Sequence, residues 1–170
     1  MVWSIIVIVL LTSADQLLKQ LIKMNLSLTD SIPVIDNFFY LVNRRNTGAA
    51  WSFLAGKDWG IYVLAAVSAV VTAIIMIIIW RSSHTRLRAC LTLIAAGSLG
   101  NLIDRVRDLA VTDYLDFHFG SYIFPTFNLA DMLIVCGTIL LALLIILDQS
   151  ILAEPTKGAK EATNDSNPAN

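Results

Sequence analysis

The feature that most constrains this chain is an uncharged stretch of 21 residues, Gly60–Trp80. An α-helix rises about 1.5 Å per residue, so this stretch is long enough to cross the roughly 30 Å hydrocarbon core of a bilayer. Hydrophobic residues make up 56% of the 170 residues, and charged residues only 15%. Soluble chains usually carry about 25% charged residues. Three more apolar stretches follow the same pattern: Val2–Ile22, Ala89–Ile103 and Asn128–Leu147.

The sequence therefore predicts an all-α membrane protein with four transmembrane helices, over about residues 2–23, 60–80, 88–105 and 128–148 of a single domain, 1–150. The third stretch is short, and it spans a bilayer only if the charged residues at both of its ends lie near the interfaces. The first stretch has no Lys or Arg before Lys19. It thus lacks the basic leader of a cleaved signal peptide, and a retained helix is expected. The polar end of the chain, residues 151–170, is expected to be a disordered cytoplasmic tail.

The basic residues indicate the orientation of the helices. The connection between the second and third helices holds Arg81, Arg86 and Arg88 and no acidic residue, so the positive-inside rule places it in the cytoplasm. Both termini are then cytoplasmic, and residues 25–59 and 106–127 lie on the outer face. The β-branched, aromatic and turn residues over 32–42 indicate short strands there.

Polar residues that are costly in a membrane gather toward the outer end of the helices. Asp15 and Lys19 are four residues apart, so they share one helix face and are interpreted as an ion pair that supports a site. Gly97, Asn101 and Arg105 also recur every four residues on one face. The small residues around Gly97 are interpreted as a close-packing surface between helices.

Asp131 is the carboxylate that most needs a function, because a charge within a membrane segment is costly. It lies three residues after Asn128, and Asp113 and Asp116 are just upstream. Two close carboxylates share a proton, since ionising both is unfavourable. One then activates water while the other polarises a carbonyl, which is the chemistry of an aspartic peptidase. From the residues alone, Asp113 and Asp116 are equally capable partners.

Other polar residues predict no separate site. Asp104 and Asp108 are interpreted as solvated interface charges, and His118 as a lone histidine without partner ligands for a metal. Cys90 and Cys136 fall in apolar stretches and are interpreted as inert packing residues. A net charge of −1 gives no indication of a nucleic-acid partner. We expect neither a metal nor a cofactor.

The alternative class is a subunit of an ion- or proton-coupled transporter, in which Asp15, Lys19 and Asp131 form a relay. Against it, the charges crowd one interface rather than crossing the membrane, and no repeat or interrupted helix pair is evident. A purely structural scaffold would explain the small residues but not the carboxylates.

Across nearly all of residues 1–150 the chain resembles the lipoprotein signal peptidase, or signal peptidase II, family. The resemblance is carried by five blocks in order: Asp15–Lys19 (DQLLK), Asn46–Ser52 (NTGAAWS), Gly97–Arg105 (GSLGNLIDR), Val111–Tyr114 (VTDY) and Phe127–Asp131 (FNLAD). Two departures concern the loops rather than the chemistry. Leu109–Ala110 precede the fourth block where the family often has a glycine, and Ala96 replaces the first of two glycines.

The resemblance implies an intramembrane aspartic endopeptidase that removes signal peptides from diacylglyceryl-modified prolipoproteins, cutting just before the lipidated cysteine. It implies Asp113, rather than Asp116, as the partner of Asp131. A helix N-terminus favours a carboxylate, so we expect Asp131 to be the ionised member and Asp113 to carry the proton. Positions matching those that bind substrate or support the site are Asp15, Lys19, Asn46, Gly48, Ala49, Gly97, Asn101, Arg105, Asn128 and Ala130.

The same resemblance implies that the outer segments form a small extracytoplasmic β-cradle and a short amphipathic helix over the substrate. The enzyme would be a monomer in the bacterial cytoplasmic (inner) membrane. Its active site would open to the extracytoplasmic face, with membrane lipids around it.

Overall fold

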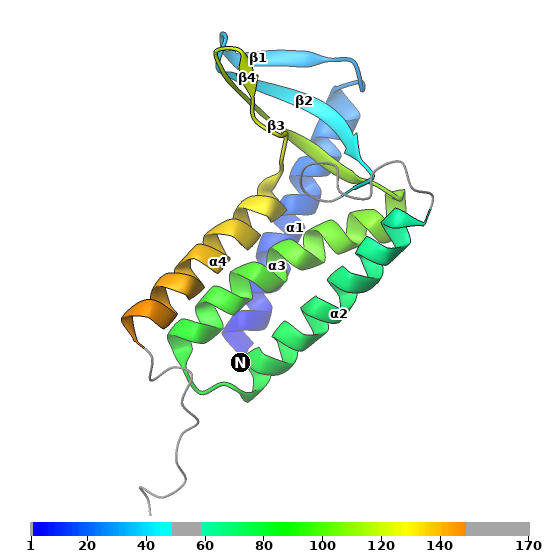
Figure 1. Ribbon diagram of the computed structural model, residues 1–170. Helices are drawn as coiled ribbons and strands as arrows, with labels where there is room; N and C mark the ends of the chain where they lie inside the picture. The colour runs from blue at the N-terminus through cyan, green and yellow to red at the C-terminus, as the bar shows by residue number, and fades with distance from the viewer. Residues whose placement is uncertain (1, 49–58, 149–170) are drawn as a thin grey trace, which may run out of the picture.

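The computed structural model describes residues 2–48 and 59–148 (Figure 1). Four helices in this part of the chain are long and apolar enough to cross a membrane, which confirms the predicted four spans. The segments between α1 and α2 and between α3 and α4 form a four-stranded sheet. The elements in chain order are α1 (Val2–Asn25), β1 (Ser31–Ile35), β2 (Phe39–Asn46), α2 (Gly60–Arg81), α3 (Thr85–Asp108), β3 (Val111–Phe119), β4 (Tyr122–Ile123) and α4 (Leu129–Leu147).

Helix α3 is longer than its uncharged stretch predicts. It has 24 residues, and at about 1.5 Å per residue it measures roughly 36 Å, enough to span a bilayer. Arg105 and Arg107 extend its last turn, where positive charge is favourable against the helix dipole. Leu109 ends the helix in the left-handed conformation, with φ at 52°.

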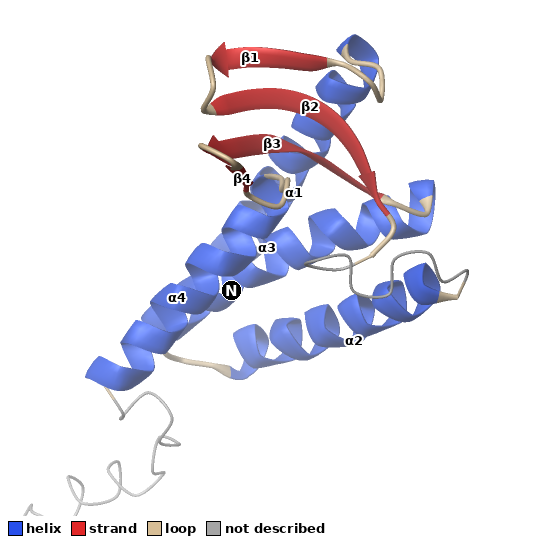
Figure 2. Ribbon diagram, turned by 45° about the horizontal axis from the view of Figure 1, so that its top comes forward, coloured by secondary structure: helices blue, strands red, loops and turns tan. Residues whose placement is uncertain are grey.

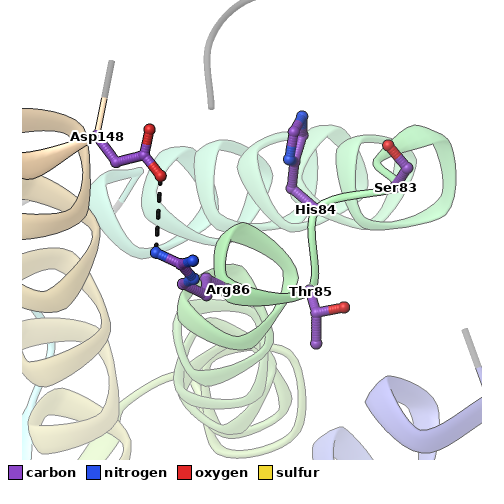
Figure 3. A pocket seen from close by; sticks show the side chains of 5 residues that line it. All are labelled: Ser83, His84, Thr85, Arg86 and Asp148. Carbon is purple, nitrogen blue, oxygen red and sulfur yellow. Dashed lines mark ion pairs between the residues drawn. The ribbon is translucent and has the colours of Figure 1, made fainter. Parts of the chain in front are cut away.

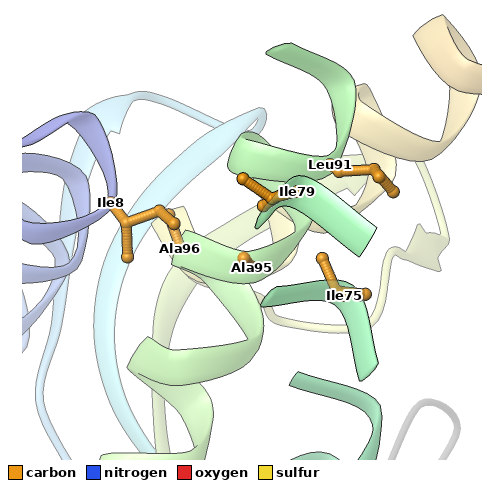
Figure 4. Close-up of a cluster of buried hydrophobic side chains, with 6 residues drawn as sticks. All are labelled: Ile8, Ile75, Ile79, Leu91, Ala95 and Ala96. Atoms are coloured by element: carbon orange, nitrogen blue, oxygen red, sulfur yellow. The ribbon is translucent and has the colours of Figure 1, made fainter. Parts of the chain in front are cut away.

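Helix α3 is also the centre of the bundle, because it packs against α1, α2 and α4 (Figure 1). In the most apolar 18-residue part of α3, 50% of the residues are buried, whereas in the same part of each of the other helices 17–22% are buried. Large apolar side chains of α2 such as Val67, Val70 and Ile74 are exposed, as expected of a surface that faces lipid. Helices α1, α2 and α3 meet in a core formed by Ile8, Ile75, Ile79, Leu91, Ala95 and Ala96 (Figure 4).

The sheet lies at one end of the bundle, near the end of α1 and the start of α4 (Figure 2). Its strands are antiparallel in the order β1-β2-β3-β4. Strands β1 and β2 contain the residues in which short strands were predicted. The β2–β3 register pairs Arg44 with Asp113 and Asn46 with Val111, so the end of β2 lies beside the start of β3.

The opposite end of the bundle holds the basic α2–α3 connection, the start of α1 and the end of α4. Arg86 Nη1 lies 3.6 Å from Asp148 Oδ2, across a hollow lined by Ser83, His84 and Thr85 (Figure 3). The guanidinium of Arg88 lies over the ring of Trp3. The basic α2–α3 connection and the sheet are therefore at opposite ends of the spans.

Two expectations fall on other residues. The expected tail, 151–170, lies outside the described residues. The described ranges contain no amphipathic helix over the sheet, and residues 49–58, between β2 and α2, are not among them. Ala49, which the resemblance places near the site, is one of these.

Candidate active site

The predicted polar residues meet where the bundle reaches the sheet, and Asn128 is at their centre. It is the N-cap of α4 and is fully buried. Its Oδ1 accepts a hydrogen bond from Asp131 N at 3.0 Å, and its own backbone N donates to Asp131 Oδ2 at 3.1 Å. This reciprocal pair is a capping box, in which an acidic residue at the third helical position returns the bond of the cap.

The same Asn128 side chain reaches the second carboxylate. Its Nδ2 donates to Asp113 Oδ1 at 2.7 Å. Asn128 therefore holds Asp131 through the helix cap and Asp113 through its amide. Asp113 and Asn128 are 15 positions apart, and they meet because β3 pairs with Phe127, the residue just before the cap. Tyr114 N and Leu115 N both donate hydrogen bonds to Phe127 O.

Asn46 holds the other oxygen of Asp113. Its Nδ2 donates to Asp113 Oδ2 at 2.9 Å, and its Oδ1 accepts from Gly48 N at 2.9 Å. A bond from a backbone N–H requires an acceptor, so it directs the amide nitrogen of Asn46 toward the carboxylate. The end of β2 thus contributes one amide donor to the site.

Asn101 holds the other oxygen of Asp131. Its Nδ2 donates to Asp131 Oδ1 at 2.7 Å, and its Oδ1 accepts from Lys19 Nζ at 2.9 Å. Because an ammonium only donates, Lys19 fixes which end of the Asn101 amide faces Asp131. Asn128 Nδ2 also lies 3.3 Å from Asn101 Oδ1, which links the two asparagines.

The expected ion pair between Asp15 and Lys19 is formed, with Lys19 Nζ 2.8 Å from Asp15 Oδ2. Asp104 Oδ2 also lies 3.1 Å from Lys19 Nζ, and all three side chains are fully buried. The interpretation of Asp104 as a solvated charge is therefore wrong, because α1 packs over it. Asp108 does remain partly exposed, in ion pairs with Lys23 and Arg107.

Helix α1 also holds the first turn of α4. Asp15 Oδ1 accepts a hydrogen bond from Ala130 N at 3.0 Å. This bond is possible because α1 and α4 both approach α3 closely at its glycines. A Cβ on Gly100 would meet the Asp15 carboxylate, and a Cβ on Gly97 would meet the backbone oxygen of Ala130. Small residues on α3 thus allow its neighbours to bring polar groups to the site.

Asp116 lies away from this arrangement. Side chains alternate along a strand, so Asp113 and Asp116 are on opposite faces of β3. Asp116 Oδ2 is 2.9 Å from His118 Nε2, and its Oδ1 accepts from Thr126 Oγ1 at 3.2 Å. His118 thus has one side-chain partner, Asp116, which the sequence did not indicate.

Arg105 brings a positive charge toward both carboxylates, since it interacts electrostatically with Asp131 and Asp113. Its Nη1 donates weakly to Ser68 Oγ at 3.5 Å. Its Nε is buried and has no hydrogen-bond partner among the described residues.

Two residues of the site were not predicted. Tyr114 accepts a hydrogen bond on its hydroxyl from Leu129 N, at 3.2 Å. Gln16 donates from Nε2 to Asp104 Oδ1 at 2.9 Å and to Gly100 O at 3.1 Å. Both lie within blocks that carry the resemblance, Gln16 in Asp15–Lys19 and Tyr114 in Val111–Tyr114, so those blocks were the sequence signal for them.

The surroundings of Asp113 favour its protonated form. Burial, and then the charge of Asp131, raise the pKa of Asp113 from 3.8 to about 7, against the opposing effect of the bonds from Asn46 and Asn128. Asp113 can thus hold a proton near neutral pH. Burial also raises the pKa of Tyr114 to about 12, so its phenol stays neutral.

Within the described ranges, no three His, Cys, Asp or Glu side chains are grouped to hold a metal ion.

Comparisons with known proteins identify one family and several similar chains. The model of a family described as signal peptidase (SPase) II matches residues 6–147. The chain is 42% identical over 146 residues to a lipoprotein signal peptidase of Bacillus pumilus (strain SAFR-032), which covers 84% of this chain and 91% of that protein. It is 39% identical over 140 residues to a lipoprotein signal peptidase of Bacillus subtilis (strain 168), which covers 82% and 90%.

Two solved structures of bacterial membrane enzymes, obtained by the in meso method, are also similar. One, at 2.3 Å resolution, has a TM-score of 0.76 and 27% identity and covers 100% of this chain and 96% of its own. The other, at 1.9 Å, has a TM-score of 0.76 and 30% identity and covers 87% and 95%.

Proposed function

The chain belongs to the signal peptidase II family, and we propose that it cleaves its substrates as an aspartic endopeptidase with Asp113 and Asp131 as the catalytic pair. Family membership makes it a multi-pass bacterial membrane protease that removes signal peptides from lipoproteins. The observation that most supports the assignment of the pair is Asn128, whose cap and amide bond both carboxylates. Membership in a peptidase family argues against the alternative of a transporter subunit.

In the proposed reaction, Asp131 is ionised and Asp113 carries the shared proton. Asp131 takes a proton from a water molecule, and the water oxygen attacks the scissile carbonyl carbon. Asp113 gives its proton to the carbonyl oxygen. When the tetrahedral intermediate collapses, the amine leaves with the proton from Asp131, and Asp113 recovers its proton from the hydroxyl group. No covalent enzyme intermediate forms.

The hydrogen bonds around the pair support these roles. Both oxygens of Asp131 accept bonds, from Asn101 and from the Asn128 backbone, and Asp131 lies in the first turn of α4, where the helix dipole favours a carboxylate. The raised pKa of Asp113 supports its role as the proton carrier. The Nε of Arg105, which has no hydrogen-bond partner among the described residues, is a candidate donor to a substrate carbonyl.

The proposed substrates are diacylglyceryl-modified prolipoproteins, cut just before the lipidated cysteine. Their acyl chains would lie in the bilayer between the helices, because the site lies at one end of the spans. The basic α2–α3 connection at the other end supports a cytoplasmic location for that end, and therefore an extracytoplasmic active site. The enzyme would act as a monomer in the cytoplasmic membrane, without a metal or cofactor.

The test uses the purified enzyme in detergent and a diacylglyceryl-modified lipopeptide. Asp113→Asn and Asp131→Asn should each lower kcat by roughly 10³-fold or more while leaving the unfolding temperature nearly unchanged, because the pair acts as a unit. Asp116→Asn is the matched control on the same strand and should cleave at the wild-type rate. An active Asp113→Asn together with an inactive Asp116→Asn would show that the pair is misassigned. Loss of activity on chelation of divalent metals would contradict metal-free catalysis.

A further inference from the structure

The hollow at the end of the bundle opposite the sheet has the chemistry of a site for an anion. It has a volume of about 310 Å³ and is lined by Ser83, His84, Thr85, Arg86 and Asp148 (Figure 3). We propose that this hollow holds the phosphate of an anionic phospholipid headgroup, with the Arg86 guanidinium as its main donor. The inference goes beyond the proposed function and is independent of the catalytic pair.

Arg86 is available to a ligand because its side chain is only loosely held. The side chain is 75% exposed, and its Nη1 lies 3.6 Å from Asp148 Oδ2, a distance too long for a hydrogen bond. A planar guanidinium can donate two parallel hydrogen bonds to one phosphate group. Arg88 is engaged elsewhere, because its guanidinium lies over the ring of Trp3 and reaches Ser4 Oγ on α1. Arg86 is the arginine that lines the hollow.

The other lining groups also suit a phosphate. The hydroxyls of Ser83 and Thr85 can donate to phosphate oxygens. His84 Nε2 is buried and has no hydrogen-bond partner among the described residues, so a ligand could satisfy it. The connection that contains these residues, 81–88, holds three arginines and no acidic residue, which gives an anion a favourable field. Asp148 is acidic, so a bound anion would compete with it for Arg86.

The surroundings of the hollow favour a lipid over a soluble anion. Trp80, just before the basic connection, is exposed, and tryptophan gathers at the level of the lipid headgroups. Ile146 and Leu147, just before Asp148, are exposed at the end of α4, which is apolar enough to span a membrane. A headgroup in the hollow would therefore have its acyl chains beside the lipid-facing surface of α4. Basic pockets between transmembrane helices are typical sites for the headgroups of anionic lipids.

The test measures binding of dioleoylphosphatidylglycerol to the full-length enzyme in an uncharged detergent at about 0.15 M salt. A ligand that binds the folded state raises the unfolding temperature, so a lipid titration gives an apparent Kd. Arg86→Gln should raise this Kd by at least about tenfold, because it removes a charge-assisted bond to the phosphate. Asp148→Asn should lower the Kd, because it removes the competing carboxylate. Arg86→Gln should cleave the lipopeptide at the wild-type rate without added lipid, since Arg86 is far from the catalytic pair.

Arg81→Gln is the matched control, because it removes the same charge from the same connection but at a position outside the lining of the hollow. It should raise the Kd by less than about threefold, since salt screens an exposed charge that does not touch the ligand. Equal losses of affinity in Arg81→Gln and Arg86→Gln would show only diffuse attraction to a basic surface and would overturn the proposal.

Two further probes identify what is recognised. Dioleoylphosphatidylcholine has the same acyl chains without the net charge, so it should raise the unfolding temperature less than dioleoylphosphatidylglycerol does. Equal effects of the two lipids would overturn the proposal. Inorganic phosphate should have little effect at the same concentration, and an effect as large as that of the anionic lipid would assign the hollow to a soluble anion instead. The activity of Asp113→Asn tests the proposed function and has no bearing on these outcomes.

Discussion

The side-chain amide of Asn128 donates a hydrogen bond to Asp113 Oδ1 across 2.7 Å, while the same residue caps the helix that carries Asp131. The start of α4 and the geometry of the proposed catalytic pair therefore depend on one side chain. This dual role allows helix stability and catalysis to be separated by substitution.

Asn128→Ser should retain the cap but lose the amide donor to Asp113. Serine caps helices about as well as asparagine, so the free energy of unfolding should change by less than about 0.5 kcal/mol. Its shorter side chain does not reach Asp113, and kcat should fall roughly 10- to 100-fold. Asn128→Ala should lose the cap as well, at about 1 kcal/mol. Unfolding in detergent and single-substrate kinetics measure both effects, and a normal kcat for Asn128→Ser would contradict the proposed role of the amide.

The rate should depend on the proton held by Asp113. Burial and the charge of Asp131 raise the pKa of Asp113 to about 7, and the proposed reaction requires its protonated form. We therefore expect kcat/KM to fall as pH rises through about 7, by roughly tenfold per pH unit beyond it. Asp116→Asn should show the same profile. An activity that increases from neutral to alkaline pH would exclude Asp113 as the proton donor.

The same carboxyl should make stability depend on pH. Its pKa is raised from 3.8 in the unfolded chain to about 7 in the folded protein, so the folded state binds this proton more tightly. The resulting stabilisation is complete below about pH 4 and is lost as pH rises through about 7. Asp113→Asn remains neutral throughout, so its unfolding temperature should decrease less than that of the wild type over this range. Equal decreases would argue against a raised pKa for Asp113.

The sequence was sufficient to predict the spans, because length and apolar composition are local properties of a segment. Four-residue spacing also placed Asp15 beside Lys19 on one helix face. The choice between Asp113 and Asp116 needed more, since nothing in the residues located β3, whose alternation separates them. Resemblance to a family supplied that choice.

Asp104 was misinterpreted for a related reason. A charged residue near the end of an apolar stretch is usually at an interface, but its partners here are Lys19 on α1 and Thr112 on β3. The contact with Lys19 joins residues far apart in the chain, and no sequence pattern indicates it. Tyr114 was not singled out for a similar reason, because no sequence pattern indicates that its hydroxyl accepts a hydrogen bond from Leu129 N at the start of α4.

Tyr114→Phe should affect stability more than catalysis. It removes the acceptor for Leu129 N, one of the N–H groups at the start of α4 that have no partner within the helix. We expect a loss of about 1 kcal/mol in the free energy of unfolding and less than about a threefold loss in kcat, because the Asn128 cap remains. Tyr122→Phe, on the exposed strand β4, is the matched control and should resemble the wild type. A large loss of kcat without a loss of stability would instead indicate a role for the phenol in the reaction.

Gly97→Ala should move Asp131 without changing any polar group. A Cβ at Gly97 would meet the backbone oxygen of Ala130, the residue before Asp131, and a backbone atom cannot rotate aside as a side chain can. The two helices must then separate locally, at a cost of about 1–3 kcal/mol. The displacement of Asp131 relative to Asp113 should lower kcat by about 100-fold. Ala69→Val, which adds bulk on an exposed position of α2, should alter neither quantity. If Gly97→Ala lost stability but kept the wild-type kcat, the close approach of α3 and α4 would serve packing alone and would not set the position of Asp131.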